Sequence, residues 1–184
     1  MKKLIFGVAL LLFATQVLGA TKKKEDTTEL PVGDLDFRTD DIKVAKSVRN
    51  NNPGNVKSGK NSKGEDWRGL VGFDEKGHCI FSNYLWGTRA MIKDIRGKVK
   101  RGDNTPAKIV PIYCPTNDGC NVPLYLSQIK KLSSIDKYDL LDYNDQNQMW
   151  NLIIAMATHE AGKTKDGKPA VILTRAIFNA AWNL

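Results

Sequence analysis

The chain has 184 residues, enough for one domain with a hydrophobic core and too few for two domains of ordinary size. Its hydrophobic content of 41% and charged content of 26% are typical of a soluble globular protein. The formal net charge of +8 favours an anionic partner, such as a cell-wall polymer, a membrane surface or a nucleic acid. Because no nucleic-acid-binding motif accompanies the scattered basic residues, we predict that the protein binds no nucleic acid.

The N-terminus has the features of a secretory signal peptide. A basic start, Met1-Lys2-Lys3, precedes an almost unbroken apolar run from Leu4 to Phe13, and small residues follow at Gly19 and Ala20. The run is too short for a comfortable membrane span, although an uncleaved anchor is the alternative. We therefore expect removal of residues 1–20, no stable membrane insertion afterwards, and a periplasmic or secreted location.

The three cysteines agree with export. Cys114 and Cys120 bracket a turn-rich loop that can bring two sulfurs together in an oxidising compartment, so we expect a disulfide between them. Cys79 is then a buried thiol, or a partner for one of the others if the short loop does not close. His78 and His159 are the only histidines and no Cys-x-x-Cys occurs, so we predict no metal site and no cofactor.

Residues 21–41 are charged and Thr-rich, which predicts a flexible linker before a domain over residues 42–184. A short helix over 41–48 leads into Arg49-Asn50-Asn51-Asn52-Pro53-Gly54-Asn55-Val56. Proline, glycine and repeated asparagine cannot continue a helix, so this stretch is either a turn held by its own amides or one wall of a polar cleft. Residues 67–73 and 78–84 then predict two strands of a hairpin, with its turn over 74–77.

Helical patterns occupy the rest of the chain. Ser82 or Asn83 can cap a helix over 86–100, and Thr105-Pro106 opens a short helix that Pro111 stops. Further helices are predicted over 122–132, over 145–159 with Asp145 as its cap, and from Pro169 to Trp182. The predicted fold class is therefore α+β, with a small antiparallel sheet preceding a helical body.

Five motifs follow one another along the chain: the Asn-rich stretch, Trp67-Arg68-Gly69, Phe81-Ser82, Gly87-Thr88-Arg89-Ala90, and finally His159-Glu160-Ala161-Gly162. This order resembles a family of phage virion-associated and secreted proteins with a lysozyme-like, lytic-transglycosylase-like domain, over roughly residues 48–182. The resemblance implies a small sheet that faces a catalytic glutamate across a sugar cleft. The sheet comes first here and the glutamate last, an order that a circular permutation of the lysozyme arrangement would give. The chain departs from the family in Ala161, where Asn is usual, and in its two loop cysteines.

Glu160 is the candidate catalytic acid. Glycosidic cleavage needs a carboxyl group that stays protonated near neutral pH, and the apolar run 152–157 before Glu160 places its carboxyl at the edge of a low-dielectric core. The alternative is an exposed residue at a helix C-terminus, where the helix dipole disfavours an anion. Glu65, Asp66 and Asp74 are candidates for a second carboxylate, although each also fits a solvated turn. Without a second carboxylate, the lytic transglycosylase route with one glutamate is favoured.

Six further residues are candidates for substrate binding. The asparagines can bind N-acetyl and hydroxyl groups, the tyrosines can stack on sugars or lie in the core, and the arginine can bind a carboxylate or form a surface salt bridge. They are Asn51, Asn52, Asn55, Tyr113, Tyr125 and Arg89.

These observations predict an exported enzyme that cleaves the glycan strands of peptidoglycan, as a lytic transglycosylase or a muramidase. One alternative is a non-catalytic wall-binding or structural protein with the same fold. Another is a cysteine peptidase or amidase that uses Cys79 or Cys114 with His159.

Overall fold

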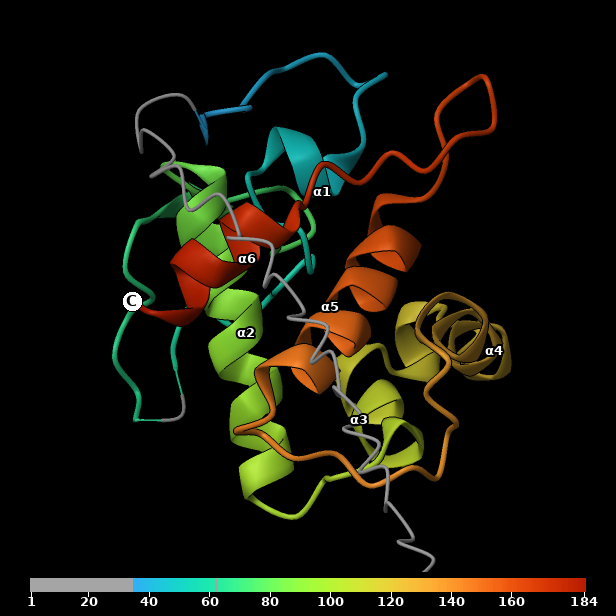
Figure 1. Ribbon diagram of the computed structural model, residues 1–184. Coiled ribbons are helices and arrows are strands. Elements are labelled where there is room, and N and C mark those ends of the chain that lie inside the picture. The colour runs from blue at the N-terminus through green and yellow to red at the C-terminus, as the bar shows by residue number, and fades with distance from the viewer. Residues whose placement is uncertain (1–34, 62) are drawn as a thin grey trace, which may run out of the picture.

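The computed structural model describes residues 35–61 and 63–184 (Figure 1). The predicted signal peptide and residues 21–34 of the predicted linker lie outside these ranges. The described elements in chain order are α1 (Lys46–Arg49), β1 (Leu70–Phe73), β2 (Cys79–Phe81), α2 (Tyr84–Lys100), α3 (Pro106–Tyr113), the 3₁₀ turn η2 (Thr116–Asp118), α4 (Val122–Ser133), α5 (Gln146–Ala161) and α6 (Arg175–Trp182). A small sheet therefore precedes a mostly helical body, which confirms the predicted α+β class.

The sheet is an antiparallel hairpin of two short strands. Leu70 pairs with Phe81 and Phe73 with Cys79, and an irregularity between Leu70 and Gly72 shifts the register. Cys79 and Phe81 are both fully buried, whereas Ile80 between them is half-buried. This alternation confirms the prediction that Cys79 and Phe81 share one face, and it directs that face towards the helices.

The helical body packs around α2 and α5. Figure 1 shows α5 between α2 and α4, with α6 crossing α2 and α3 beneath α5. Asn83 caps α2 by accepting from the Trp86 amide, and Asp145 caps α5 by accepting from the Asn147 and Gln148 amides, both as predicted. No helix within the described ranges has the combined length and apolar character that a membrane span requires. The core includes Met91, Ile92, Ile95, Tyr125, Ile129, Leu152, Ile153, Met156 and Phe178.

Two helix boundaries differ from the prediction. Pro111 lies inside α3, which continues to Tyr113, because packing of Ile109 and Val110 in the core outweighs one missing backbone hydrogen bond. The last helix begins at Arg175 instead of Pro169, with Thr174 as its cap. Pro169 instead pairs across a loop with Lys163 in an isolated bridge. Pro169, which suits the first turn of a helix, therefore lies in a loop that precedes the helix.

The described end of the predicted linker packs on the domain. Leu35 is buried, and the ring of Phe37 meets the ring of Tyr84 edge-on, with 5.7 Å between centroids. The Phe37 amide donates to Asn51 Oδ1 at 2.9 Å. Residues 35–37 therefore belong with the folded domain, ahead of the predicted boundary at residue 42.

Gly87 allows α2 to touch the Asn-rich stretch. A Cβ at this position would lie 1.8 Å from the Asn51 carbonyl oxygen, a backbone atom that cannot move aside cheaply. A Cβ at Gly97, in the same helix, would meet only the flexible end of Arg101, at 3.3 Å. The two glycines therefore have different roles, one in packing and one without a packing requirement.

We expect Gly87→Ala to destabilise the protein by about 1–3 kcal/mol or more, because it overpacks a backbone contact. The matched variant Gly97→Ala should be neutral or stabilising by up to about 1 kcal/mol, since alanine favours a helix. Urea unfolding of the two variants measures the difference. Equal effects at both positions would contradict the proposed contact.

Candidate active site

Asn51 and Asn52 hold the Asn-rich stretch against the sheet. Asn51 Nδ2 donates to the Phe81 carbonyl at 3.1 Å, and Asn52 Nδ2 donates to the Cys79 carbonyl at 2.9 Å. The Asn52 oxygen also accepts from the Val56 amide at 2.9 Å. Both side chains are fully buried. In this structure Asn51 and Asn52 have a structural role, and their binding of substrate stays a prediction.

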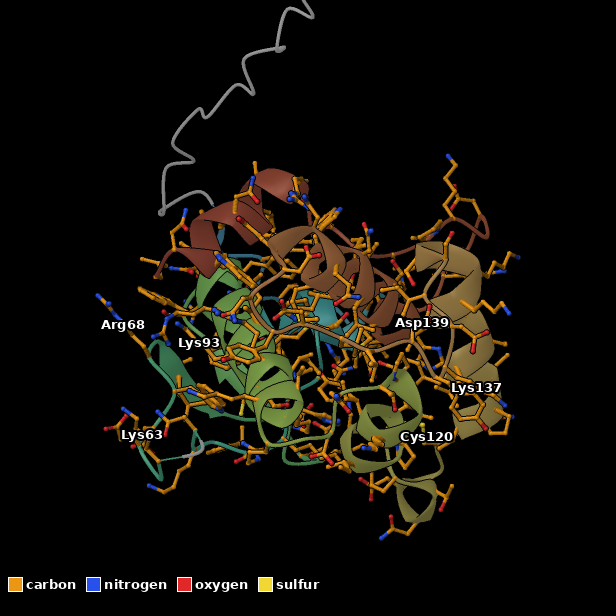
Figure 2. All side chains as sticks on the ribbon, turned by 60° about the horizontal axis from the view of Figure 1, so that its bottom comes forward. Lys63, Arg68, Lys93, Cys120, Lys137 and Asp139 are labelled. Atoms are coloured by element: carbon orange, nitrogen blue, oxygen red, sulfur yellow. A yellow bond between two sulfur atoms is a disulfide. The ribbon has the colours of Figure 1, made fainter. Side chains whose placement is uncertain are left out.

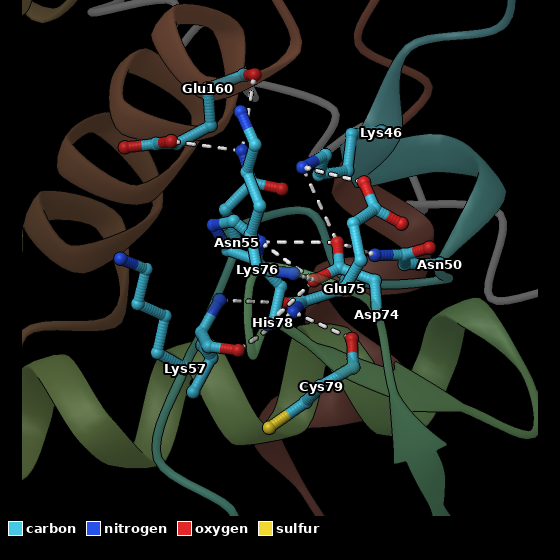
Figure 3. Close-up of polar contacts among 12 residues, drawn as sticks. Lys46, Asn50, Asn55, Lys57, Asp74, Glu75, Lys76, His78, Cys79 and Glu160 are labelled. Atoms are coloured by element: carbon cyan, nitrogen blue, oxygen red, sulfur yellow. Dashed lines mark hydrogen bonds and ion pairs between the residues drawn. The ribbon is translucent and has the colours of Figure 1, made fainter. Parts of the chain in front are cut away.

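Asn55 is the member of the stretch that reaches the glutamate. Its Nδ2 donates to Glu160 Oε2 at 3.0 Å across 105 positions of sequence (Figure 3). Its φ of 47° lies in the left-handed region, which asparagine tolerates better than most residues. The Asn55 Oδ1 atom is buried and has no hydrogen-bond partner within the described part of the chain. One end of the amide thus fixes the carboxyl, and the other end has a free acceptor.

The second carboxyl oxygen of Glu160 is held from α4. The Tyr125 hydroxyl donates to Oε1 at 2.9 Å. Tyr125 is fully buried and its hydroxyl is directed at Glu160, so a direct contact with substrate stays a prediction. The His159 ring stacks on the Tyr125 ring with 3.7 Å between centroids, and His159 Nδ1 lies 2.5 Å from Gln128 Oε1. His159 does not face its neighbour Glu160 directly, but it positions the tyrosine that does.

The environment of Glu160 favours the protonated form of its carboxyl group. The residue is half-buried at the C-terminal end of α5, where the helix dipole disfavours an anion, and no cation of the described residues forms an ion pair with it. Burial raises the pKa of the Glu160 carboxyl, although the hydrogen bonds from Asn55 and Tyr125 oppose this shift. Burial and the nearby glutamate also raise the pKa of the Tyr125 hydroxyl well above its ordinary value, so this group stays a donor.

Glu160 opens into a pocket of about 360 Å³ between the sheet side of the molecule and the helical body. This volume lies within the range of small-ligand sites. Two further carboxylates line the pocket, but each is paired with a lysine: Asp94 with Lys98 at 2.5 Å and Asp118 with Lys57 at 2.7 Å. The remaining lining includes Gly54, Asn55, Ser58, His78, Ile112, Tyr113 and Pro115.

Tyr113 forms part of the pocket wall. Its hydroxyl donates to the Gly54 carbonyl at 2.5 Å, so only its ring is available to a ligand. A Cβ at Gly54 would lie 2.2 Å from that hydroxyl, which explains the glycine. The predicted disulfide between Cys114 and Cys120 is present directly after Tyr113, and it constrains the loop that carries Asp118.

His78 is a site residue that the sequence interpretation used only to exclude a metal site. Its Nδ1 lies 3.1 Å from both carboxyl oxygens of Asp74, which also accepts from Asn50 Nδ2 and pairs with Lys46 (Figure 3). Burial raises the pKa of Asp74, but hydrogen bonds from the His78 and Lys76 amides and from the Asn50 and His78 side chains outweigh it and keep this pKa far below its ordinary value. Burial lowers the pKa of His78, although Asp74 opposes this shift. The hydrogen bond to Asp74 places the proton on Nδ1 and leaves Nε2 as an acceptor without a partner among the described residues.

The other predicted carboxylates and the predicted arginine lie away from the pocket. Glu65 accepts from Asn61, and Asp66 pairs with Lys60, both on the exposed surface. Arg89 does not line the pocket that contains Glu160, and its binding of a substrate carboxylate stays a prediction. At about 100° per residue, Arg89 points roughly 140° away from Asp94, the pocket residue on the same helix.

The cysteine-nucleophile alternative has no reactive thiol. Cys79 is fully buried, its sulfur lies 3.4 Å from the Ser58 carbonyl, and burial raises its pKa to about 11. Cys114 is in the disulfide. A nucleophilic cysteine needs an accessible thiolate, which neither residue supplies. Within the described ranges, His, Cys, Asp and Glu side chains also form no group of three or more that could hold a metal ion.

Comparison with known protein families and with curated proteins finds no match to this chain.

Glu160→Gln should change the pH dependence of stability. Folding raises the pKa of Glu160, so the parent protein loses unfolding free energy as the pH rises from the ordinary value of 4.5 through the raised pKa. Glutamine carries no such charge, and the Asn55 amide can turn its free Oδ1 towards the glutamine NH₂. The variant should therefore become more stable relative to the parent as the pH approaches neutrality. Urea unfolding across a pH series measures this difference in unfolding free energy between variant and parent.

Glu75→Gln, which changes an exposed carboxyl on the hairpin, is the matched control. If the difference in unfolding free energy between Glu160→Gln and the parent stays constant with pH, the Glu160 carboxyl is as well solvated as a surface group.

Proposed function

We propose that this protein is an exported enzyme that cleaves the glycan strands of peptidoglycan, with Glu160 as the general acid. The observation that carries this proposal is the state of the Glu160 carboxyl. It is half-buried in a pocket, no cation of the described residues forms an ion pair with it, and a donor holds each of its oxygens. A carboxyl group in such a setting can keep a proton near neutral pH and deliver it to a ligand.

The contacts of Glu160 suit both halves of a proton transfer. Burial favours the protonated acid before the reaction, because it penalises the charged form. As the glycosidic bond breaks and the leaving oxygen takes the proton, Glu160 becomes a carboxylate. The Tyr125 hydroxyl and the Asn55 amide then stabilise that charge, because hydrogen bonds to an anion are stronger than those to a neutral acid.

Two groups of the pocket can accept the second proton of the reaction. In the lytic transglycosylase route, Glu160 takes it back from the hydroxyl group of the sugar, which closes an anhydro ring. His78 Nε2 is the other acceptor, because Asp74 fixes the ring with a free lone pair in the same pocket. A water activated by His78 would instead give a hydrolysed, reducing end.

The order of motifs supports a lysozyme-like fold for this enzyme. The resemblance from Arg49 to Gly162 expects an Asn-rich turn on the sheet side and a glutamate at a helix end, and Asn55 and Glu160 meet in that way. The sheet-first order fits a circular permutation of the lysozyme arrangement. The N-terminal pattern and the Cys114–Cys120 disulfide favour a periplasmic or secreted protein. A non-catalytic peptidoglycan-binding or structural protein is the alternative.

Purified peptidoglycan tests the proposed acid. We expect the protein to release soluble muropeptides, and we expect Glu160→Gln to reduce the rate about 10²- to 10⁴-fold, the usual contribution of a general acid. Glu75→Gln should act like the parent. Mass analysis of the products separates anhydro ends from reducing ends.

Full activity in Glu160→Gln would remove Glu160 from the mechanism. Binding to insoluble peptidoglycan with no soluble product from the parent would favour the non-catalytic alternative.

The role of His78 predicts a pH effect. The ring must be neutral to accept a proton, so activity that uses it falls as the pH drops through the pKa of His78. Burial and the positive charges of Lys46 and Lys57 lower this pKa, and Asp74 opposes them. His78→Gln should lower the rate and abolish this acid limb, while the alkaline limb that Glu160 causes remains. Rate measurements from pH 4 to pH 9, at roughly constant ionic strength, separate the limbs. An acid limb that persists in His78→Gln would exclude His78 as the proton acceptor.

A further inference from the structure

A stripe of basic side chains runs along the face of α2 that points away from the pocket. Its members follow one another at helical spacings of four, three and four residues. Such spacings bring side chains within about 60° of one another and extend over roughly 16 Å of helix. We name Arg89, Lys93, Arg96 and Lys100 the cationic stripe.

No carboxylate compensates the cationic stripe. Among the described residues, none of its four side chains forms an ion pair, whereas Lys98 of the same helix pairs with Asp94. The Arg89 Nε atom is buried without a hydrogen-bond partner. Burial lowers the pKa of Lys93, and the positive charges of Arg89 and Arg96 lower it further. The fold thus holds like charges together at a cost in free energy, which an anion would relieve.

The stripe is also fixed in place by aromatic rings. The Arg96 guanidinium lies 3.9 Å from the centroid of the Trp182 ring, and its Nε donates to the Tyr143 carbonyl at 2.8 Å. Arg68, from the segment before β1, lies 4.4 Å from the centroid of the Trp86 ring and extends the basic surface. Figure 2 shows Arg68 and Lys93 projecting from the same side of the molecule beside α2. Arg96 therefore has little side-chain entropy left to lose when a ligand binds.

We propose that the cationic stripe binds a linear polymer of phosphodiester groups that lacks aromatic bases, namely a polyol-phosphate chain of the cell wall. Guanidinium groups bind phosphate oxygens in a bidentate manner, and a row of cations suits a chain with regularly repeated charge. The surface offers no stacking platform for nucleobases, because Trp86 and Trp182 are half-buried against the core and each ring is covered by a guanidinium. The helix also presents no exposed large hydrophobic side chain that could enter a membrane.

This binding site does not depend on the proposed cleavage reaction. None of the four stripe residues lines the pocket that contains Glu160. Lys93 lines a neighbouring hollow that shares Ser58 and Asp94 with that pocket. Loss of the Glu160 carboxyl should therefore leave polymer binding intact. The stripe would hold the protein on the wall while the pocket acts on a glycan strand.

The test measures the affinity of the folded protein for purified poly(glycerol phosphate) by calorimetry at several salt concentrations. We expect Arg89→Gln/Lys93→Gln to weaken binding by roughly tenfold or more and to reduce the slope of log K against log salt by about two. Lys93→Gln/Lys100→Gln should weaken binding similarly. This second variant leaves Arg89 in place, so its weaker binding would not come from a loss of stability at that position. Lys163→Gln/Lys165→Gln, with the same change in net charge on an exposed loop, should bind like the parent.

Glu160→Gln should also bind like the parent, which separates this proposal from the proposed function. Equal weakening in the loop variant, or no weakening in either stripe variant, would overturn the proposal. Tighter binding of a single-stranded oligonucleotide or of phosphatidylglycerol vesicles than of poly(glycerol phosphate) would also overturn it and would assign the stripe to that partner.

Discussion

The carboxyl group of Glu160 joins three parts of the chain that are far apart in sequence. Asn55 holds one oxygen from the sheet side, and Tyr125 holds the other from α4. These two hydrogen bonds fix the position of the Glu160 carboxyl relative to the sheet side and to α4. They also set up opposing effects on one proton, since burial favours the acid and both donors favour the anion. A group balanced in this way can change its charge during a reaction without moving.

The buried amides and α2 make this arrangement possible. The side chains of Asn51 and Asn52 donate to backbone carbonyls of β2, as a neighbouring strand would. Asn55 is then directed at Glu160. Gly87 lets α2 approach this stretch at backbone distance. The same helix then carries two kinds of surface. Asp94 and Lys98 neutralise each other beside the pocket, while the cationic stripe on another face keeps its charge uncompensated.

Periodicity and capping residues predicted most elements of the fold, because those signals are local. The disulfide and the importance of Glu160 were also readable, from a short loop between cysteines and from an acid after an apolar run. The roles of Asn51 and Asn52 were not, since a polar cluster looks alike whether it faces a ligand or its own backbone. His78 was missed because its partner, Asp74, lies across a hairpin turn. The position of Arg89 outside the pocket could not be predicted, because its motif does not indicate which face of the helix meets the pocket.

The central claim is that folding holds the Glu160 carboxyl in its protonated form above the ordinary pH range of glutamate. A carbon-13 NMR titration of the side-chain carboxyl groups, with Glu160→Gln to assign the resonance, measures this directly in the intact protein. The account predicts a Glu160 pKa above the ordinary 4.5. A value at or below 4.5 would contradict it, because the two donors would then outweigh burial and leave no proton to give.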